Sequence, residues 1–132
     1  MKKDWIYIGI FLDFRSTEEL IQTFHAPIDW KRYCDHVTLA YNDGTKLQEI
    51  SKQVNTRNIG RTVEFKVVAF GVSEKATAIK VELPLGVFCA NKIPHITIAV
   101  SPEGKPVDSN DIQVWNDIAT PIFLKGTINK HI

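Results

Sequence analysis

Three features that point to particular classes of protein are scarce in this sequence: cysteine, excess charge of one sign, and long apolar runs. Two cysteines in 132 residues are too few for the disulfide framework of small secreted domains. Sixteen Lys and Arg against fifteen Asp and Glu leave a net charge of +1, which excludes a general electrostatic grip on a nucleic-acid duplex. The longest apolar stretch, residues 5–12, is far shorter than the roughly twenty residues that cross a bilayer.

These scarcities favour a cytoplasmic protein without a membrane span. The sequence does not open with a basic and then apolar leader ending in small residues, which agrees with a reducing compartment. The remaining composition, 44% hydrophobic and 23% charged, is ordinary for a soluble globular protein, and the length suits one hydrophobic core. We therefore expect a single domain over residues 1–132 that acts as a monomer.

Runs rich in β-branched and aromatic residues predict most of the strands. The segment between the third and fourth of them is short enough for a hairpin, because it contains only residues 71–75. The predicted strands cover residues 5–12, 36–41, 62–70, 76–83, 95–100 and 122–128, with a further short run at 86–90.

Helical signals are fewer. Ser16 and Glu19 match a capping box, which predicts a short helix that stops before Pro27. Leu47, Ile50 and Val54 recur at helical spacing and predict a second helix, and residues 112–118 are a third predicted helical segment. About seven strands and two or three short helices, with no linker between them, predict an α+β domain with a mainly antiparallel sheet.

One five-residue pattern occurs twice. Residues 36–40 and 95–99 both read His-aliphatic-Thr-aliphatic-Ala, 59 residues apart, and each lies in a predicted strand. The strand period of two places His36 with Thr38, and His95 with Thr97, on one face, while the aliphatic residues anchor the other face. If the two strands lie near each other, two imidazoles and two hydroxyls converge on one groove.

Such a constellation suits phosphodiester cleavage without a metal. One imidazole of His36 and His95 can be neutral and take a proton from water, while the other is charged and gives a proton to the leaving oxygen. The hydroxyls of Thr38 and Thr97 can bond the non-bridging oxygens of the phosphate. The sequence leaves open which histidine is the base.

With both motifs intact, the sequence resembles the 2H phosphoesterase superfamily, whose signature is two His-x-Thr/Ser-x motifs. Residues 95–98, followed by residues 105–110, look most like the cyclic phosphodiesterase domain of fungal tRNA ligases and its stand-alone relatives. The resemblance implies a bilobal fold of pseudo-two-fold antiparallel sheets. It also implies a groove for RNA ends or oligonucleotides, with His36 and His95 catalytic and Thr38 and Thr97 bound to phosphate.

The function favoured by these observations is hydrolysis of a 2′,3′-cyclic phosphate at an RNA or nucleotide end, giving a 2′-phosphate, without a metal or cofactor. One alternative is a phosphodiesterase that degrades signalling oligonucleotides, either 2′-5′-linked or cyclic. Another is a module that binds an RNA end or nucleotide without turning it over.

Three further residues are ancillary candidates. Tyr41 is a candidate to stack a base, although it shares strand parity with Val37 and a place in the core is favoured. Arg57 and Lys92 are candidates to contact phosphate, although a solvated loop is favoured for both. No metal site is expected, since neither cysteine has a second ligand at zinc-like spacing.

Overall fold

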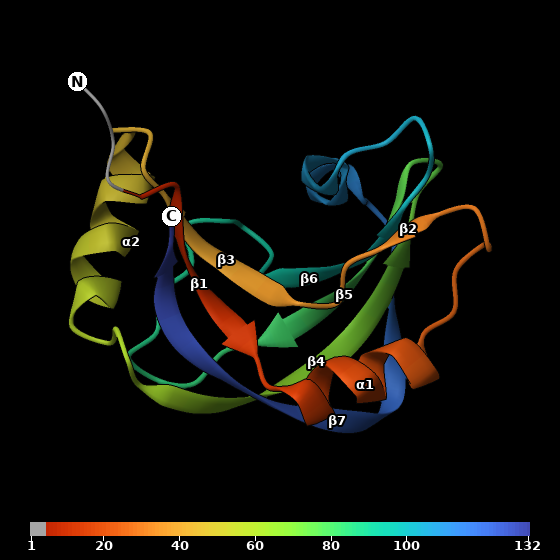
Figure 1. Ribbon diagram of the computed structural model, residues 1–132, viewed down its shortest axis with the longest axis horizontal. Coiled ribbons are helices and arrows are strands. Elements are labelled where there is room, and N and C mark those ends of the chain that lie inside the picture. The colour runs from red at the N-terminus through yellow and green to blue at the C-terminus, as the bar shows by residue number, and fades with distance from the viewer. Residues whose placement is uncertain (1–4) are drawn as a thin grey trace.

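Seven antiparallel strands form one sheet in the computed structural model, which describes residues 5–132 (Figure 1). The strand order is β2-β6-β3-β1-β7-β4-β5, and an additional pairing of β5 with β6 closes the sheet on itself. The strands are β1 (Tyr7–Leu12), β2 (Lys31–Arg32), β3 (His36–Tyr41), β4 (Thr62–Val72), β5 (Ala76–Glu82), β6 (His95–Val100) and β7 (Trp115–His131). This architecture confirms the predicted α+β class with antiparallel strands.

The inner face of the closed sheet holds the hydrophobic core. In β4, inward and outward residues alternate along the whole strand, as expected of a sheet with one wet face. The central strand β1 contributes Ile8 and Ile10, both with no exposed surface. The largest fully buried apolar side chains are Ile8, Ile10, Leu20, Leu39, Ile79, Ile96, Ile98, Leu124, Ile128, Val37 and Val67.

The first helix, α1 (Phe14–Thr23), begins earlier than predicted. Its cap is Asp13, whose carboxylate accepts a hydrogen bond from the Ser16 backbone N–H at 2.8 Å. The predicted capping box is wrong, because Ser16 is buried and its hydroxyl accepts instead from the backbone N–H of Lys125 at 2.8 Å. The Ser16 hydroxyl therefore makes a tertiary contact with β7 in place of the local helix cap that the sequence predicted.

The second helix, α2 (Lys46–Thr56), lies where predicted and packs against β3 (Figure 1). Two buried polar residues attach it to its surroundings. The Ser51 hydroxyl contacts the Leu39 carbonyl at 2.7 Å, and the Asn55 amide donates to the Phe88 carbonyl at 2.6 Å. These bonds fasten the end of β3 and the irregular segment 83–94 to one helix. None of the helices within residues 5–132 has the length and hydropathy needed to cross a membrane.

Two further sequence expectations are wrong, and one short strand was not predicted. Residues 86–90 form no strand, and β2 was not foreseen because two residues carry no periodic signal. The helical segment expected at 112–118 is displaced: a 3₁₀ helix, η1 (Pro106–Asp111), precedes it, and β7 already begins at Trp115. Strand β7 continues past Pro121 because its pairing with β4 is irregular there, so the missing N–H of proline costs no ladder bond.

Candidate active site

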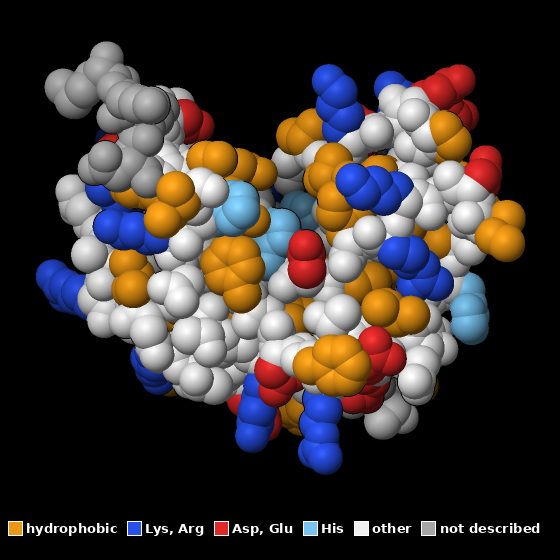
Figure 2. All heavy atoms as spheres, in the orientation of Figure 1, with side chains coloured by type: hydrophobic (Ala, Val, Ile, Leu, Met, Phe, Trp, Pro, Cys, Tyr) orange, Lys and Arg blue, Asp and Glu red, His pale blue; other side chains and the backbone are white. Residues whose placement is uncertain are grey.

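The two repeated motifs lie side by side. Strands β3 and β6 pair antiparallel at one point, Val37 with Ile96. Continuing this register sets His36 across from Thr97 and Thr38 across from His95, on the face opposite the core. All four side chains line one pocket. Figure 2 shows histidine side chains gathered where the surface is hollowed between the two sides of the molecule.

The pocket has walls from several elements besides these strands. One wall comes from β3 and the residues just before it, and the other from β6, the segment 83–94 and η1. Its lining residues are Tyr33, Asp35, His36, Thr38, Tyr41, Asn91, His95, Thr97, Pro106, Val107 and Asn110.

Each motif strand contains a β-bulge at the same place. In the β1–β3 pair, Ile8 faces Ala40 and Gly9 faces Thr38, which leaves Leu39 as the extra residue. In the β5–β6 pair, Ile98 is the extra residue by the same reasoning. The two motifs are therefore alike in backbone geometry as well as in sequence.

The first bulge corrects the expectation for Tyr41. Strict alternation would place Tyr41 with Val37 and Leu39 in the core, but the extra residue reverses the faces beyond Leu39. Ala40 is consequently buried and Tyr41 is 37% exposed at the edge of the pocket. Gly9 permits the close approach of the two strands, because a Cβ atom there would lie 2.8 Å from the Val37 carbonyl oxygen.

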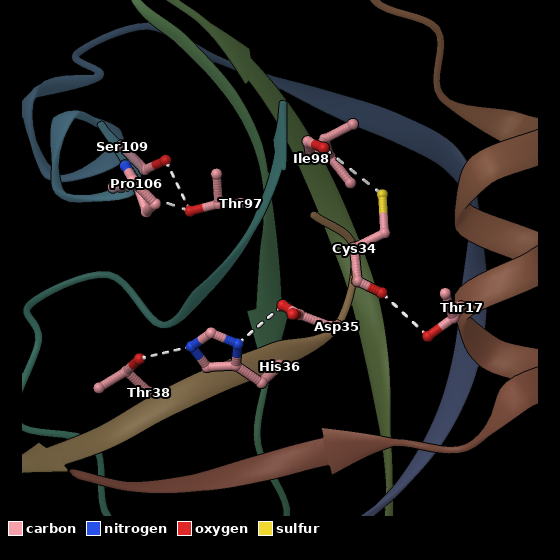
Figure 3. Close-up of polar contacts among 9 residues, drawn as sticks. All are labelled: Thr17, Cys34, Asp35, His36, Thr38, Thr97, Ile98, Pro106 and Ser109. Atoms are coloured by element: carbon pink, nitrogen blue, oxygen red, sulfur yellow. Dashed lines mark hydrogen bonds and ion pairs between the residues drawn. The ribbon is translucent and has the colours of Figure 1, made fainter. Parts of the chain in front are cut away.

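His36 is held between a carboxylate and a hydroxyl (Figure 3). Its Nδ1 lies 2.8 Å from Oδ1 of Asp35, and its Nε2 lies 3.1 Å from the hydroxyl of Thr38. The hydrogen bond from His36 lowers the pKa of the Asp35 carboxyl. Because a carboxylate only accepts, Nδ1 carries a proton, and Nε2 is the nitrogen available to the pocket.

An aromatic ring supports the His36 imidazole from β1. The Tyr7 ring is stacked on it with centroids 4.9 Å apart, and a further ring neighbour of Tyr7 is His131 on β7, at 4.8 Å. Burial, together with the negative charge of Asp35, raises the pKa of Tyr7 to about 12, which keeps its hydroxyl protonated. The His36 ring therefore has little freedom to turn.

A strained corner positions Asp35 and His36. Cys34 has φ of 55°, the only positive value at a residue other than glycine among the residues described. Its backbone N–H donates to the Thr97 carbonyl at 3.0 Å, and its own carbonyl accepts from the Thr17 hydroxyl at 2.9 Å (Figure 3). The corner thus ties the start of β3 both to α1 and to the second motif.

His95 has a different environment. Its Nδ1 donates to the backbone carbonyl of Ile93 at 2.8 Å, since a carbonyl can only accept. The neutral ring therefore presents an unprotonated Nε2. Burial is the main cause that lowers the pKa of His95, and the neighbouring His36 lowers it further.

The two threonines also differ. The Thr97 hydroxyl lies 2.9 Å from the hydroxyl of Ser109, which is buried in η1, and 3.4 Å from the Pro106 carbonyl. Thr38 contacts its own histidine instead. Both threonines border the pocket, where their hydroxyls can act as hydrogen-bond donors.

The three ancillary candidates lie at different distances from the pocket. Tyr41 borders the pocket, and Lys92 lines an adjoining cavity that shares His95. Arg57 lies elsewhere, in a depression beside α2 with Gln53 and Gly86. No group of three or more His, Cys, Asp or Glu within residues 5–132 is arranged to hold a metal ion.

Sequence reasoning missed several lining residues. Asp35 had a visible signal, since it directly precedes the first motif histidine. Tyr33, Asn91, Pro106, Val107 and Asn110 lie outside the motif strands, and only the closed topology brings them to the pocket. No periodicity in the sequence marks them.

Comparison with known proteins bears on both the family and the fold. The sequence model of the fungal tRNA ligase phosphodiesterase domain matches residues 15–121. A crystal structure of a fungal RNA kinase has a similar fold, with a TM-score of 0.70 at 17% sequence identity. The match covers 100% of this chain and 46% of that one, so the chain spans about half of that structure. No curated protein matches the sequence at a significant level.

Proposed function

The chain belongs to the family of fungal tRNA ligase phosphodiesterase domains, and from that premise we propose that it hydrolyses a 2′,3′-cyclic phosphate at an RNA end to a 2′-phosphate. The observation that carries this proposal is that His36, Thr38, His95 and Thr97 line one pocket. Two imidazoles and two hydroxyls that line one site for phosphate match what a metal-independent phosphodiesterase needs.

His95 is assigned as the general base. A base must be unprotonated at working pH, and burial lowers the pKa of His95, which favours its neutral form. The hydrogen bond of Nδ1 to Ile93 fixes the tautomer in which Nε2 holds the free electron pair. Water bound on this side of the phosphate is therefore the nucleophile.

His36 is assigned as the general acid. When its ring carries both protons, Nδ1–H donates to the Asp35 carboxylate and the positive charge has a partner at 2.8 Å. Nε2–H then points to the pocket, beside Thr38. The ribose of the substrate, which carries the leaving O3′, lies on this side.

The proposed step is an in-line displacement. The water oxygen forms a bond to phosphorus as Nε2 of His95 takes its proton, and the bond from phosphorus to O3′ breaks as Nε2 of His36 donates a proton to O3′. The hydroxyls of Thr38 and Thr97 orient the non-bridging oxygens. The product has a 2′-phosphate and a free 3′-hydroxyl, and exchange with solvent restores both rings.

Two ancillary residues support this scheme, and one does not. Tyr41 borders the phosphate pocket, and Lys92 adds a cation to the adjoining cavity. Arg57 takes no part, because it lines a separate depression.

The test is turnover with identification of products. The protein is incubated with an RNA oligonucleotide that ends in a 2′,3′-cyclic phosphate, and in parallel with 2′-5′ oligoadenylate and a cyclic dinucleotide. We expect conversion of the first substrate to a 2′-phosphate. Preferential cleavage of either of the others would assign the protein to degradation of signalling oligonucleotides, and a ligand that stays intact for hours while bound would mark a binding module.

A further inference from the structure

Resting on the proposed function, we propose that the groove binds the last two nucleotides of an RNA strand, one at each end of the phosphate pocket. The terminal base stacks on Tyr41, and the preceding nucleotide lies against Tyr33 and Lys31. The substrate class is then an oligonucleotide end in preference to a mononucleoside 2′,3′-cyclic phosphate.

Two tyrosines at opposite ends of one strand carry this inference. Tyr33 lies just before β3 and Tyr41 is its last residue, with His36 and Thr38 between them. Both rings border the same pocket. Proteins that bind single-stranded nucleic acid stack unpaired bases on aromatic rings, and this stacking depends little on which base is present.

The connectivity of ribose requires two exits from the pocket. In a 2′,3′-cyclic phosphate, the base is attached beside C2′, while the 5′ chain leaves from C4′, beside C3′. When the C2′–C3′ edge faces the phosphate site, the base and the rest of the strand therefore leave in opposite directions. A ring at each end of the pocket meets this requirement.

Charge decides which end takes the strand. The preceding nucleotide brings a phosphodiester, whereas the terminal base brings no charge. None of the Lys or Arg residues among 5–132 borders the pocket itself, but the Lys31 ammonium lies 5.2 Å from the centre of the Tyr33 ring. The carboxylate at the Tyr33 end, that of Asp35, is paired with His36 at 2.8 Å. Beyond Tyr41 the chain continues to the acidic Asp43. Figure 2 shows Lys and Arg side chains, interspersed with hydrophobic ones, on one side of the hollow.

A hydrogen bond from the backbone N–H holds the main chain of each tyrosine in place. The Tyr33 N–H donates to the Ile98 carbonyl at 2.9 Å, which joins it to the second motif strand. The Tyr41 N–H donates to the side-chain carbonyl of Gln48 in α2 at 2.6 Å. These bonds hold the two Cα positions, so each ring extends from a fixed point of the backbone.

The experiment compares adenosine 2′,3′-cyclic phosphate with the dinucleotide ApA ending in the same group. For each, kcat/KM is measured, and the affinity for the corresponding 2′-phosphorylated product is measured by calorimetry. We expect the wild type to favour the dinucleotide about tenfold in both quantities, the effect of one stacked base. In Tyr33→Leu and Lys31→Gln, the ratio of dinucleotide to mononucleotide values falls toward one. In Tyr41→Leu, kcat/KM and affinity fall by a similar factor for both compounds.

Phe123→Leu is the matched control, because Phe123 is 60% exposed on β7 and does not border the pocket. It leaves both compounds unchanged. The inference is overturned if the wild type treats the two compounds alike, or if Tyr33→Leu weakens both equally while hydrolysis persists. If the wild type hydrolyses neither compound, the proposed function fails, and the product affinities still decide whether two nucleotides bind.

Discussion

The His36 strand and the His95 strand have the same sequence pattern and the same bulge, yet their histidines lie in different surroundings. His36 is partly exposed, bonded to a carboxylate and stacked on a tyrosine. His95 is bonded to a neutral carbonyl, and burial is the main cause that lowers its pKa. A repeated motif places two like groups in one pocket, and in the proposed mechanism the neighbours of each motif decide which group gives a proton and which takes one.

The threonines extend the contrast. Thr38 contacts its own histidine, so its hydroxyl is coupled to the protonation of His36. Thr97 is held by Ser109 and the Pro106 carbonyl, so its hydroxyl is oriented by η1. In the proposed mechanism, the His36 motif therefore links proton transfer to phosphate contact, whereas the His95 motif separates them.

The largest expected effect comes from removing either ring. His36→Ala and His95→Ala should each lower kcat on a cyclic phosphate end by at least about a hundredfold, the usual contribution of a positioned acid or base. Both rings face the pocket, so thermal unfolding should change little. His25→Ala, at an exposed position outside the pocket, is the control. Activity within a few fold of wild type in either motif variant would remove the acid and base assignment.

Removing the carboxylate should affect only the His36 half. Asp35→Asn preserves the size of the side chain but leaves the doubly protonated His36 ring without a negative partner. We expect kcat to fall about tenfold, since a charge-assisted hydrogen bond is worth about 1.5–3 kcal/mol. The fall is measured as steady-state kcat on the cyclic phosphate end.

Asp29→Asn, at an exposed position away from the pocket, serves as the control for this variant. A kcat for Asp35→Asn within about twofold of wild type would show that the carboxylate does not support the acid.

The threonine variants should have smaller effects. Thr38→Ala and Thr97→Ala each remove one neutral hydrogen bond to phosphate, worth about 1 kcal/mol, so each should lower kcat/KM about fivefold. The double variant should show a clear loss. Steady-state kinetics decides this, and a single threonine variant as damaged as a histidine variant would contradict the division of roles.

The pH dependence should show the lowered pKa of His95 directly. A general base acts only when neutral, so activity should fall on acidification as His95 gains its proton, at a pH below the ordinary histidine value. The two limbs belong to the coupled pair, and His95→Ala should remove the acidic one from whatever activity remains. A wild-type rate that stays flat from about pH 5 to 9 would exclude paired histidine catalysis.

Chelation should have the smallest effect. Two imidazoles and two hydroxyls carry every step of the proposed reaction, so turnover should persist in excess EDTA. Loss of activity with rescue by a divalent ion would replace this mechanism with a metal-dependent one.

Local patterns predicted the elements that carry the motifs, but not the geometry between them. Both motif strands and the turn into α2 followed from β-branched runs and helical spacing. The bulge at Leu39, which turns Tyr41 to the pocket, could not be predicted because it arises from pairing with β1. The kink at Cys34 likewise depends on partners in α1 and β6, which are distant in sequence.

The central claim, that His36 is the acid and His95 the base, is tested most directly with a substrate whose leaving O3′ is replaced by sulfur. A thiolate leaves without protonation, because a thiol is far more acidic than an alcohol. We predict that His36→Ala hydrolyses this substrate at close to the wild-type rate, while His95→Ala stays at least about a hundredfold slower. Rescue of His95→Ala in place of His36→Ala, or of neither variant, would contradict the account.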